Sequence, residues 1–253
     1  MDIGICIVPA APIRKKASHK VEMVNQLLFG EAMQIVLRKR NWYKIQSLQD
    51  NYEGWIRNNL LIHVEESTLD NSFVAVDVVN TISIGGTNMN VPTGSTLHHL
   101  KNGEGRIGPT RYTFKGFSFN RNDIKPGEDI IRQLSFQWLN APYLWGGRTP
   151  LGVDCSGFVQ VVFKMMGIDL LRDANQQVGQ GMKIKKLQEA ACGDLAFFKN
   201  KKDKITHVGI LLNPGQIIHA SGKVRIDEIN EKGIINTDTK KQTHSLAAIR
   251  RFW

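Results

Sequence analysis

The sequence predicts an α+β domain at the C-terminal end of the chain, preceded by two small β-barrels. From residue 123 onward, two apolar patterns of helical period come first and alternating apolar runs follow, which is typical of helices packed on an antiparallel sheet. Before residue 123, short apolar runs alternate with turn residues, which favours small barrels. Hydrophobic residues make up 42% of the 253 residues and charged residues 22%, and these globular values argue against disorder.

Residues 1–65 and 66–122 are each expected to form one small β unit. In the first unit, the expected strands are Ile3–Val8, Val21–Leu28, Ala32–Leu37, Trp42–Gln46 and Glu53–Arg57. In the second unit, which is richer in glycine, they are Val74–Val79, Ile82–Ile84, Ser95–Leu100 and Tyr112–Phe117. Turn-prone residues such as Gly30 and Asn51 separate the strands. No fixed-period repeat relates the two units, so they do not form a repeat array.

Residues 123–253 begin with two expected helices. The first opens with an acidic pair after a proline and carries apolar side chains at three- and four-residue steps as far as Leu139. The second, from about Ser156 to Met166, is apolar nearly all round, which predicts a buried helix. The strands expected after the helices are Leu195–Phe198, Val208–Leu212, Gln216–Ala220, Val224–Asp227 and Leu246–Arg250.

The net charge of +10 favours acidic partners, although a solvated basic surface explains it equally well. No basic helix or aromatic–basic β motif indicates nucleic-acid binding. No stretch approaches the ~18 apolar residues of a membrane span, so no membrane partner is expected. The N-terminus has no basic segment before its apolar run, which Pro9 and Pro12 interrupt. We therefore expect a cytoplasmic protein, or a periplasmic one if a signal peptide has been removed.

Cys155 is the candidate nucleophile. It lies in the string G-V-D-C-S-G, where a polar loop meets the start of the expected buried helix. The first turn of a helix favours negative charge and is expected to lower the pKa of the thiol below its ordinary value of about 8.5. Asp154 or Ser156 is expected to cap that turn. Cys6 and Cys192 are interpreted as structural, and the absence of any C-x-x-C pair favours reduced thiols.

A cysteine nucleophile needs a base, and two of the seven histidines are candidates. His207 and His219 lie in an expected hairpin with its turn near Asn213–Gly215. Because side chains alternate along a strand, an even loop would place the two imidazoles on opposite faces of the sheet. An odd loop or one bulge would place them on one face, roughly 7–8 Å apart, and a catalytic pair requires that register. The remaining histidines are interpreted as solvated: His19, His63, His98, His99 and His244.

Five short motifs follow one another in the last part of the chain. They are P-Y-L-W-G-G from Pro142, D-C-S-G-F from Asp154, G-D-L-A-F-F from Gly193, T-H-V-G-I from Thr206 and I-I-H-A-S from Ile217. Together they resemble the NlpC family of papain-like cell-wall peptidases. The resemblance covers about residues 123–253 and implies a papain-like catalytic domain there.

Three further strings occur near the N-terminus: P-I-R from Pro12, M-V-N-Q-L-L-F-G-E from Met23 and Y-E-G-W-I from Tyr52. They resemble the bacterial SH3-like domain that precedes this peptidase in one subgroup. That subgroup has two SH3-like domains, which the resemblance places over residues 1–65 and 66–122. The second is similar by position more than by motif.

The resemblance implies roles for the motif residues. Cys155 would be the nucleophile, His207 its base, and His219 the polar third member that fixes the imidazole tautomer. The side chains implied to line the substrate site are Tyr143, Asp154, Ser156 and Trp145, the last of which is equally well explained by packing. A carboxylate beside the thiol, as at Asp154, suits a substrate with a free α-ammonium group.

The subgroup also closes its site with an acidic and an aromatic residue of the first SH3-like domain. The candidates for these two positions are Glu22, Glu31, Tyr52 and Trp55. The chain departs from the family pattern at Ala174, where relatives often carry serine. A hydrogen bond to substrate is therefore missing, or is supplied by Asn175.

The function implied by the resemblance is hydrolysis of the γ-D-glutamyl–diamino acid bond in murein peptides with a free N-terminal L-Ala, as in cell-wall peptide recycling. Two alternatives stay open: an acyltransferase or amidase on the same triad, and a catalytically dead cell-wall-binding module. Cysteine and histidine are also zinc ligands, but the spacing does not call for a metal, and we expect no cofactor. We expect a monomer acting on a small peptide, with lysine or meso-diaminopimelate as the diamino acid.

Overall fold

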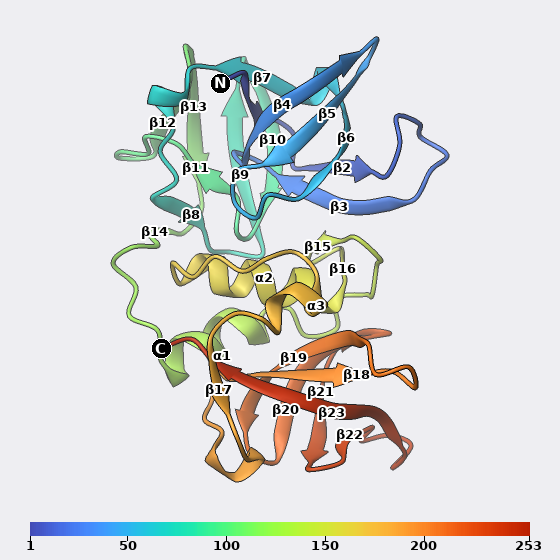
Figure 1. Cartoon of the computed structure of the whole chain (residues 1–253). Helices are drawn as coiled ribbons and strands as arrows, with labels where there is room; N and C mark the ends of the chain where they lie inside the picture. The colour runs from blue at the N-terminus through green and yellow to red at the C-terminus, as the bar shows by residue number, and fades with distance from the viewer. The chain divides into compact units, whose positions relative to one another are not determined.

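The computed structural model describes all residues of the chain, 1–253. It divides into two compact units, whose elements are drawn in Figure 1. Unit 1 comprises residues 1–124, 145–150 and 164–169. Unit 2 comprises residues 125–144, 151–163 and 170–253. The three expected domains do not appear as such in this division, and their bounds stay a prediction.

The N-terminal part of unit 1 is a seven-stranded antiparallel sheet in the order β3-β2-β6-β5-β4-β1-β7. Its strands are β1 (Ile3–Cys6), β2 (Ala10–Arg14), β3 (Met23–Leu28), β4 (Ala32–Lys39), β5 (Trp42–Ser47), β6 (Glu53–Arg57) and β7 (Leu61–Val64), with a short 3-10 helix at Asn58–Leu60. The sequence pattern does not indicate β2, because Pro12 interrupts its apolar run. Pro12 nevertheless lies opposite Gln26 of β3. The buried side chains of Ile13, Ile45 and Ile56 pack in one core.

The next part of unit 1 holds two smaller sheets, in the orders β10-β9-β13-β12 and β11-β8-β14. Their strands are β8 (Phe73–Ala75), β9 (Val79–Ile84), β10 (Thr87–Pro92), β11 (Thr96–Leu97), β12 (Glu104–Ile107), β13 (Thr110–Lys115) and β14 (Ser118–Asn120), after a 3-10 helix at Glu66–Thr68. The ring of Tyr112 meets that of Phe29 edge to face, with centroids 5.9 Å apart. Both rings belong to one buried cluster that also includes Ile5.

His98 is buried in this part of unit 1, so its interpretation as a solvated side chain is wrong. Its Nδ1 accepts a hydrogen bond from the backbone N–H of Asp70 at 3.1 Å, and its Nε2 donates to the carbonyl of Gly30 at 2.7 Å. Burial lowers the pKa of His98, which favours the neutral ring that makes both bonds. His98 therefore joins two turns of the fold.

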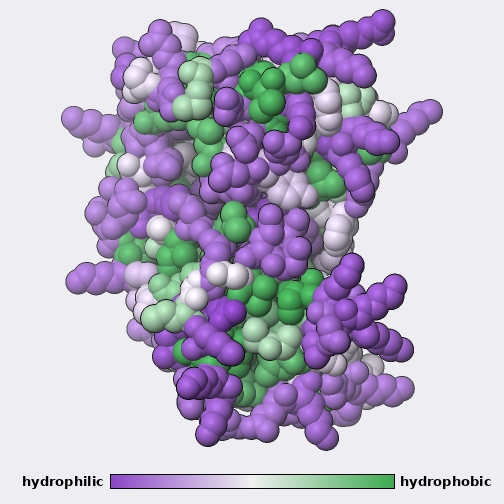
Figure 2. Space-filling model, in the orientation of Figure 1, coloured by the Kyte–Doolittle hydropathy of each residue, from purple (hydrophilic) through white to green (hydrophobic).

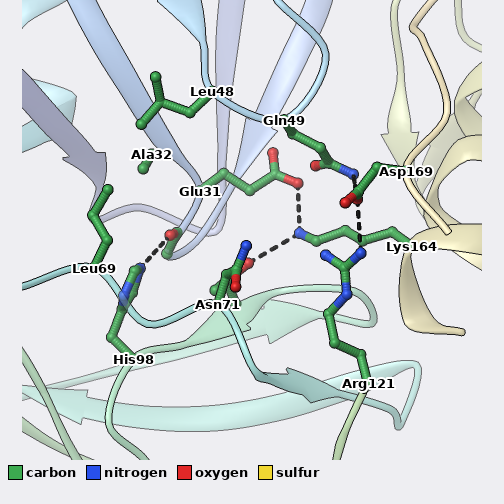
Figure 3. A pocket seen from close by; sticks show the side chains of 12 residues that line it. Glu31, Ala32, Leu48, Gln49, Leu69, Asn71, His98, Arg121, Lys164 and Asp169 are labelled. Atoms are coloured by element: carbon green, nitrogen blue, oxygen red, sulfur yellow. Dashed lines mark hydrogen bonds and ion pairs between the residues drawn. The ribbon is translucent and has the colours of Figure 1, made fainter. Parts of the chain in front are cut away.

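A buried ion cluster centred on Glu31 also lies in unit 1, and Figure 3 shows its side chain pointing toward that of Lys164. The Glu31 carboxylate accepts hydrogen bonds from Arg148 at 2.6 and 2.9 Å and from Lys164 Nζ at 2.7 Å. Lys164 also donates to the Gly94 carbonyl and the Thr96 hydroxyl. Burial alone would raise the pKa of Glu31, but the two cations lower it to about 2. The Glu31 carboxylate is thus ionised, and both of its oxygens accept hydrogen bonds from buried cations.

Unit 2 holds the larger helices and a second antiparallel sheet, in the order β17-β23-β18-β19-β20-β21-β22. Its helices are α1 (Glu128–Phe136), α2 (Cys155–Met165, whose last residues fall in unit 1), α3 (Ala174–Gln177) and a 3-10 helix at Leu187–Glu189. The strands are β17 (Met182–Ile184), β18 (Leu195–Lys199), β19 (Ile205–Asn213), β20 (Gln216–Ser221), β21 (Lys223–Asn230), β22 (Gly233–Ile235) and β23 (Gln242–Arg251). Two short strands, β15 (Arg148–Thr149) and β16 (Gly152–Val153), precede α2. A further pairing of β22 with β23 closes the sheet on itself.

The helices and the antiparallel sheet of unit 2 agree with the coarse expectation, although the chain as a whole is sheet-rich with few helices. The prediction that α2 is buried is confirmed, since Phe158, Val162 and Phe163 have no exposed surface. The first helix ends at Phe136, earlier than expected. The short helix α3 was not expected; the side chain of Asp173 caps its start. The papain-like arrangement of helices and sheet stays a prediction.

Figure 2 shows a largely hydrophilic face, broken by small hydrophobic patches. Exposed apolar side chains such as Leu151 and Trp145 are ordinary features of a folded surface. No helix of the chain combines the length and the apolar character that crossing a membrane would require.

Candidate active site

The two candidate histidines are brought together by an irregular hairpin. In β19 and β20, Gly209 lies opposite His219, and a bulge interrupts the register between Leu211 and Asn213. The bulge places His207, two residues before Gly209, on the same face as His219. Their ring nitrogens His207 Nε2 and His219 Nδ1 are 2.8 Å apart. The one-bulge register that a catalytic pair requires is therefore confirmed.

Gly209 makes room for this pair. A Cβ atom at Gly209 would lie 2.8 Å from the Cβ of His219 and 2.8 Å from the side chain of Ile217, closer than Cβ contacts normally come. We expect Gly209→Ala to displace the His219 side chain from its hydrogen bond with His207 and to lower kcat by about 10²-fold. A displacement near 1 Å is enough for such a loss. Steady-state kinetics would measure it. Gly215→Ala in the same hairpin, where the nearest atom is 3.4 Å away, is the matched control, and equal losses in both variants would contradict the steric argument.

Cys155 begins α2 and is buried, with its thiol against β19 at Val208, the residue after His207. Burial raises the pKa of Cys155 to about 12, with the charge of Asp154 as the next cause, and backbone hydrogen bonds from Val208 and Ser156 only partly offset these effects. The expectation that the helix start lowers this pKa is wrong. Desolvation outweighs the helix dipole here.

His207 is neutral for a similar reason. Burial holds its pKa well below the usual range, and the neighbouring His219 and His244 add to the effect. The resting site therefore contains a neutral thiol and a neutral imidazole. A neutral imidazole can accept the proton of a neutral thiol, which is the chemistry of a general base.

Asp154 is paired with Arg172, a residue that the motif analysis did not single out. Arg172 is 1% exposed, and its two terminal nitrogens donate to the two oxygens of Asp154 at 3.0 and 2.5 Å. The carboxylate also accepts from the backbone N–H of Gly157 at 2.7 Å, so Asp154 caps α2, as one of the two expected caps. Ser156 joins this network, since its Oγ accepts from Arg172 at 2.9 Å. Asp154 is thus a helix cap that is ion-paired with Arg172 and lies next to Cys155 in the chain.

Tyr143 lies close to the same groups. Burial raises the pKa of its phenol to about 12, and the negative charge of Asp154 contributes. The side chain is 38% exposed, and its backbone N–H donates to the carbonyl of Gly222. A neutral phenol at this place can donate a hydrogen bond to a substrate beside the thiol.

Two further side chains complete the histidine cluster, and sequence reasoning missed both. Asp227 of β21 is buried, and its Oδ2 lies 3.0 Å from His219 Nε2. His244 of β23 stacks on His207 with ring centroids 4.2 Å apart, so its interpretation as solvated is wrong. Burial lowers the pKa of His244 to about 4. In the expected strand Val224–Asp227, Asp227 lies on the face opposite Val224 and Ile226, so the apolar pattern gave no signal for it.

The candidates near the N-terminus lie in unit 1. Trp145 donates from Nε1 to Glu22 Oε1 at 2.8 Å, which brings two of the candidates together. Tyr52 lies just before β6, where its backbone N–H donates to Asp50, and Trp55 is half-buried within β6. Glu31 is engaged in the ion cluster described above. No group of three or more His, Cys, Asp or Glu side chains has a geometry that could hold a metal ion.

A buried thiol against Val208, the residue after His207, together with the His207–His219 hydrogen bond, is the arrangement expected of a cysteine enzyme of acyl transfer. Comparison with known proteins gives the family. The sequence model described as NlpC/P60 family matches residues 140–243, and that described as bacterial dipeptidyl-peptidase Sh3 domain matches residues 13–61.

Similar proteins extend over most of the chain. Gamma-D-glutamyl-L-lysine dipeptidyl-peptidase of Bacillus subtilis (strain 168) is 30% identical over 217 residues, which cover 77% of this chain and 71% of that protein. Dipeptidyl-peptidase 6 of Lysinibacillus sphaericus is 24% identical over 267 residues, covering 90% and 92%. The crystal structure of an NlpC/P60 family protein from Bacillus cereus has a similar fold, with a TM-score of 0.83 and 20% identity over 98% of this chain and 99% of that one. The chain belongs to the NlpC/P60 family of cysteine peptidases.

Proposed function

We propose that the protein hydrolyses the γ-D-glutamyl–diamino acid bond of short murein peptides with a free N-terminal L-Ala, as a step of cell-wall peptide recycling. The observation that carries the proposal is the hydrogen-bonded pair His207 and His219, with the thiol of Cys155 against Val208, the residue after His207. The relative from Bacillus subtilis, whose name specifies a γ-D-glutamyl-L-lysine bond, supports the choice of substrate.

The geometry suggests how the reaction proceeds. Cys155 Sγ attacks the carbonyl carbon of the γ-D-glutamyl amide while its proton passes to His207 Nδ1, the ring nitrogen that does not face His219. The backbone N–H of Cys155, at the start of α2, stabilises the oxyanion. His207 then gives the proton to the departing amine, which leaves a thioester on Cys155. Water, deprotonated by His207, hydrolyses the thioester and regenerates the thiol.

The proposed substrate contacts are the seven candidate side chains Tyr143, Asp154, Ser156, Trp145, Glu22, Tyr52 and Trp55. Because Arg172 already pairs with Asp154 inside the protein, we propose that this carboxylate mainly orients the site. Glu22 is the better candidate for binding a substrate ammonium group, because its ion pair with Lys15 is 3.6 Å long and its side chain is 45% exposed.

Mass spectrometry of peptides incubated with the protein tests the function. We expect release of L-Ala-D-Glu from L-Ala-γ-D-Glu-L-Lys or from its meso-diaminopimelate counterpart, whereas the N-acetylated copies stay intact. The preferred diamino acid is the one cleaved with the higher kcat/KM. Equal cleavage of acetylated and free peptides would contradict the requirement for a free amine. Cleavage of neither would contradict the proposed function.

An acyltransferase would use the same thioester, and the same experiment separates it from a hydrolase. With an added amine acceptor such as glycine methyl ester, a transferase yields the L-Ala-D-Glu adduct of the acceptor as its main product, and a hydrolase yields the free dipeptide. A catalytically dead binding module would yield neither product. The complete set of Cys155, His207 and His219 favours catalysis over that alternative.

A further inference from the structure

Asp227 is the third member of a continuous chain of hydrogen bonds that starts at the candidate base His207. His207 Nε2 lies 2.8 Å from His219 Nδ1, and His219 Nε2 lies 3.0 Å from Asp227 Oδ2. His219 and Asp227 are 1% and 2% exposed, so water does not compete for these bonds. The strand pairing sets this arrangement, because Ile217 of β20 lies opposite Asp227 and His219 is its diagonal neighbour.

The carboxylate of Asp227 is held in one orientation. Its other oxygen, Oδ1, accepts hydrogen bonds from Arg225 at 2.8 Å and from the backbone N–H of Thr237 at 2.9 Å. Burial alone would raise the pKa of Asp227, but hydrogen bonds from His219, Arg225 and the Thr237 backbone hold it well below its usual value. The carboxylate is therefore ionised and can only accept hydrogen bonds.

A hydrogen-bond acceptor at this end determines which ring nitrogen of each histidine carries the proton. Because Asp227 accepts, His219 must carry its proton on Nε2, which leaves a lone pair on His219 Nδ1. That lone pair requires His207 to carry its proton on Nε2. The remaining nitrogen, His207 Nδ1, then has a lone pair, which is the form that can take the proton of Cys155.

We propose that Asp227 is a positioning residue for catalysis, which fixes the tautomer of His219 and, through it, the tautomer of His207 that acts as base. The catalytic role of Asp227 rests on the proposed function. The assignment of the two tautomers does not. Asp227 does not touch the substrate or the thiol. Its negative charge also stabilises the His207 imidazolium that forms during attack.

The substitution Asp227→Asn tests the proposal because the structure determines how the amide lies. Arg225 and the Thr237 N–H are both donors, so the amide oxygen stays with them and the amide NH₂ faces His219 Nε2. His219 must then carry its proton on Nδ1, which donates to His207 Nε2, so His207 carries its own proton on Nδ1. We expect kcat to fall by about 10²- to 10⁴-fold with little change in KM, because the shape of the site is preserved.

The ¹⁵N chemical shifts of the histidine rings report the tautomers directly, without any substrate. We expect protons on Nε2 of His207 and His219 in the wild type and on Nδ1 of both in Asp227→Asn. Glu228→Gln is the matched control: the same chemical change on the neighbouring, exposed residue, which pairs with Lys240. It should leave both the tautomers and kcat unchanged.

The outcomes separate this inference from the proposed function. Wild-type shifts with Nε2 protons support the chain of tautomers even if no murein peptide is cleaved. If Asp227→Asn does not fold, the wild-type shifts alone decide, and an Nδ1 proton on His219 overturns the proposal. An unchanged kcat in a folded Asp227→Asn overturns the catalytic role while peptide cleavage by the wild type stands. Asp227→Glu, which keeps an acceptor, should recover at least part of kcat.

Discussion

Cys155→Ala is expected to abolish turnover of the murein tripeptide, with kcat reduced by at least about 10⁴-fold. Without the sulfur no thioester can form, and His207 has no thiol proton to accept; only binding and the oxyanion donors remain. The residual rate is best measured by mass spectrometry over long incubations. A residual rate within 10-fold of the wild type would show that Cys155 is not the nucleophile.

The controls for this result are available within the chain. Cys192 is half-buried, and Cys6 is buried with its thiol bound to the carbonyls of Val8 and Leu27. Cys192→Ala should leave kcat unchanged, because this residue has no place in the proposed mechanism. Thermal unfolding should show that Cys155→Ala is folded, since the change removes only one buried sulfur, with a cost of about 1 kcal/mol.

Glu31→Ala is expected to lower the free energy of unfolding by about 3–5 kcal/mol. Glu31 is the shared anion of Arg148 and Lys164, each of which has less than 5% of its side chain exposed, and its removal leaves two buried cations facing each other. Urea unfolding of the whole chain measures the loss. Glu53→Ala is the control: Glu53 pairs with Lys44 at 2.6 Å but is 49% exposed, so its loss should cost less than about 1 kcal/mol.

The pH dependence of stability provides a second test of Glu31. Because the pKa of Glu31 is lowered to about 2 from an ordinary value of 4.5, its contribution is present above pH 4.5 and is lost as the pH falls toward 2. The difference in stability between wild type and Glu31→Ala should therefore shrink over that interval. A difference that is constant from pH 6 to pH 2.5 would contradict an ionised Glu31.

Local signals in the sequence predicted where the candidate residues lie in the fold. The junction of a polar loop and an apolar helix made Cys155 a candidate, and α2 forms where its pattern predicts. The hairpin that carries His207 and His219 follows from two apolar runs around Pro214. The pattern also shows that these imidazoles meet only with a bulge or an odd loop, and the bulge occurs.

The remaining features depend on contacts between distant segments. Arg172 reaches Asp154 across 18 residues, and His244 stacks on a ring that lies 37 positions earlier in the chain. The periodic pattern of apolar residues in the sequence does not indicate contacts between segments so far apart in the chain. The raised pKa of Cys155 was missed for the same reason, because desolvation depends on what the fold packs around a thiol and not on its neighbours in sequence.

The most direct test of the central claim is to label the nucleophile with a substrate-like reagent. An L-Ala-γ-D-Glu chloromethyl ketone places an electrophilic carbon where the scissile carbonyl would lie, and peptide mapping by mass spectrometry locates the adduct. We expect one adduct, on Cys155, with Cys6 and Cys192 unmodified, and slower labelling of His207→Ala. An adduct on another residue, or none while the wild type still cleaves peptide, would contradict the assignment of Cys155 as the nucleophile of a γ-D-glutamyl peptidase.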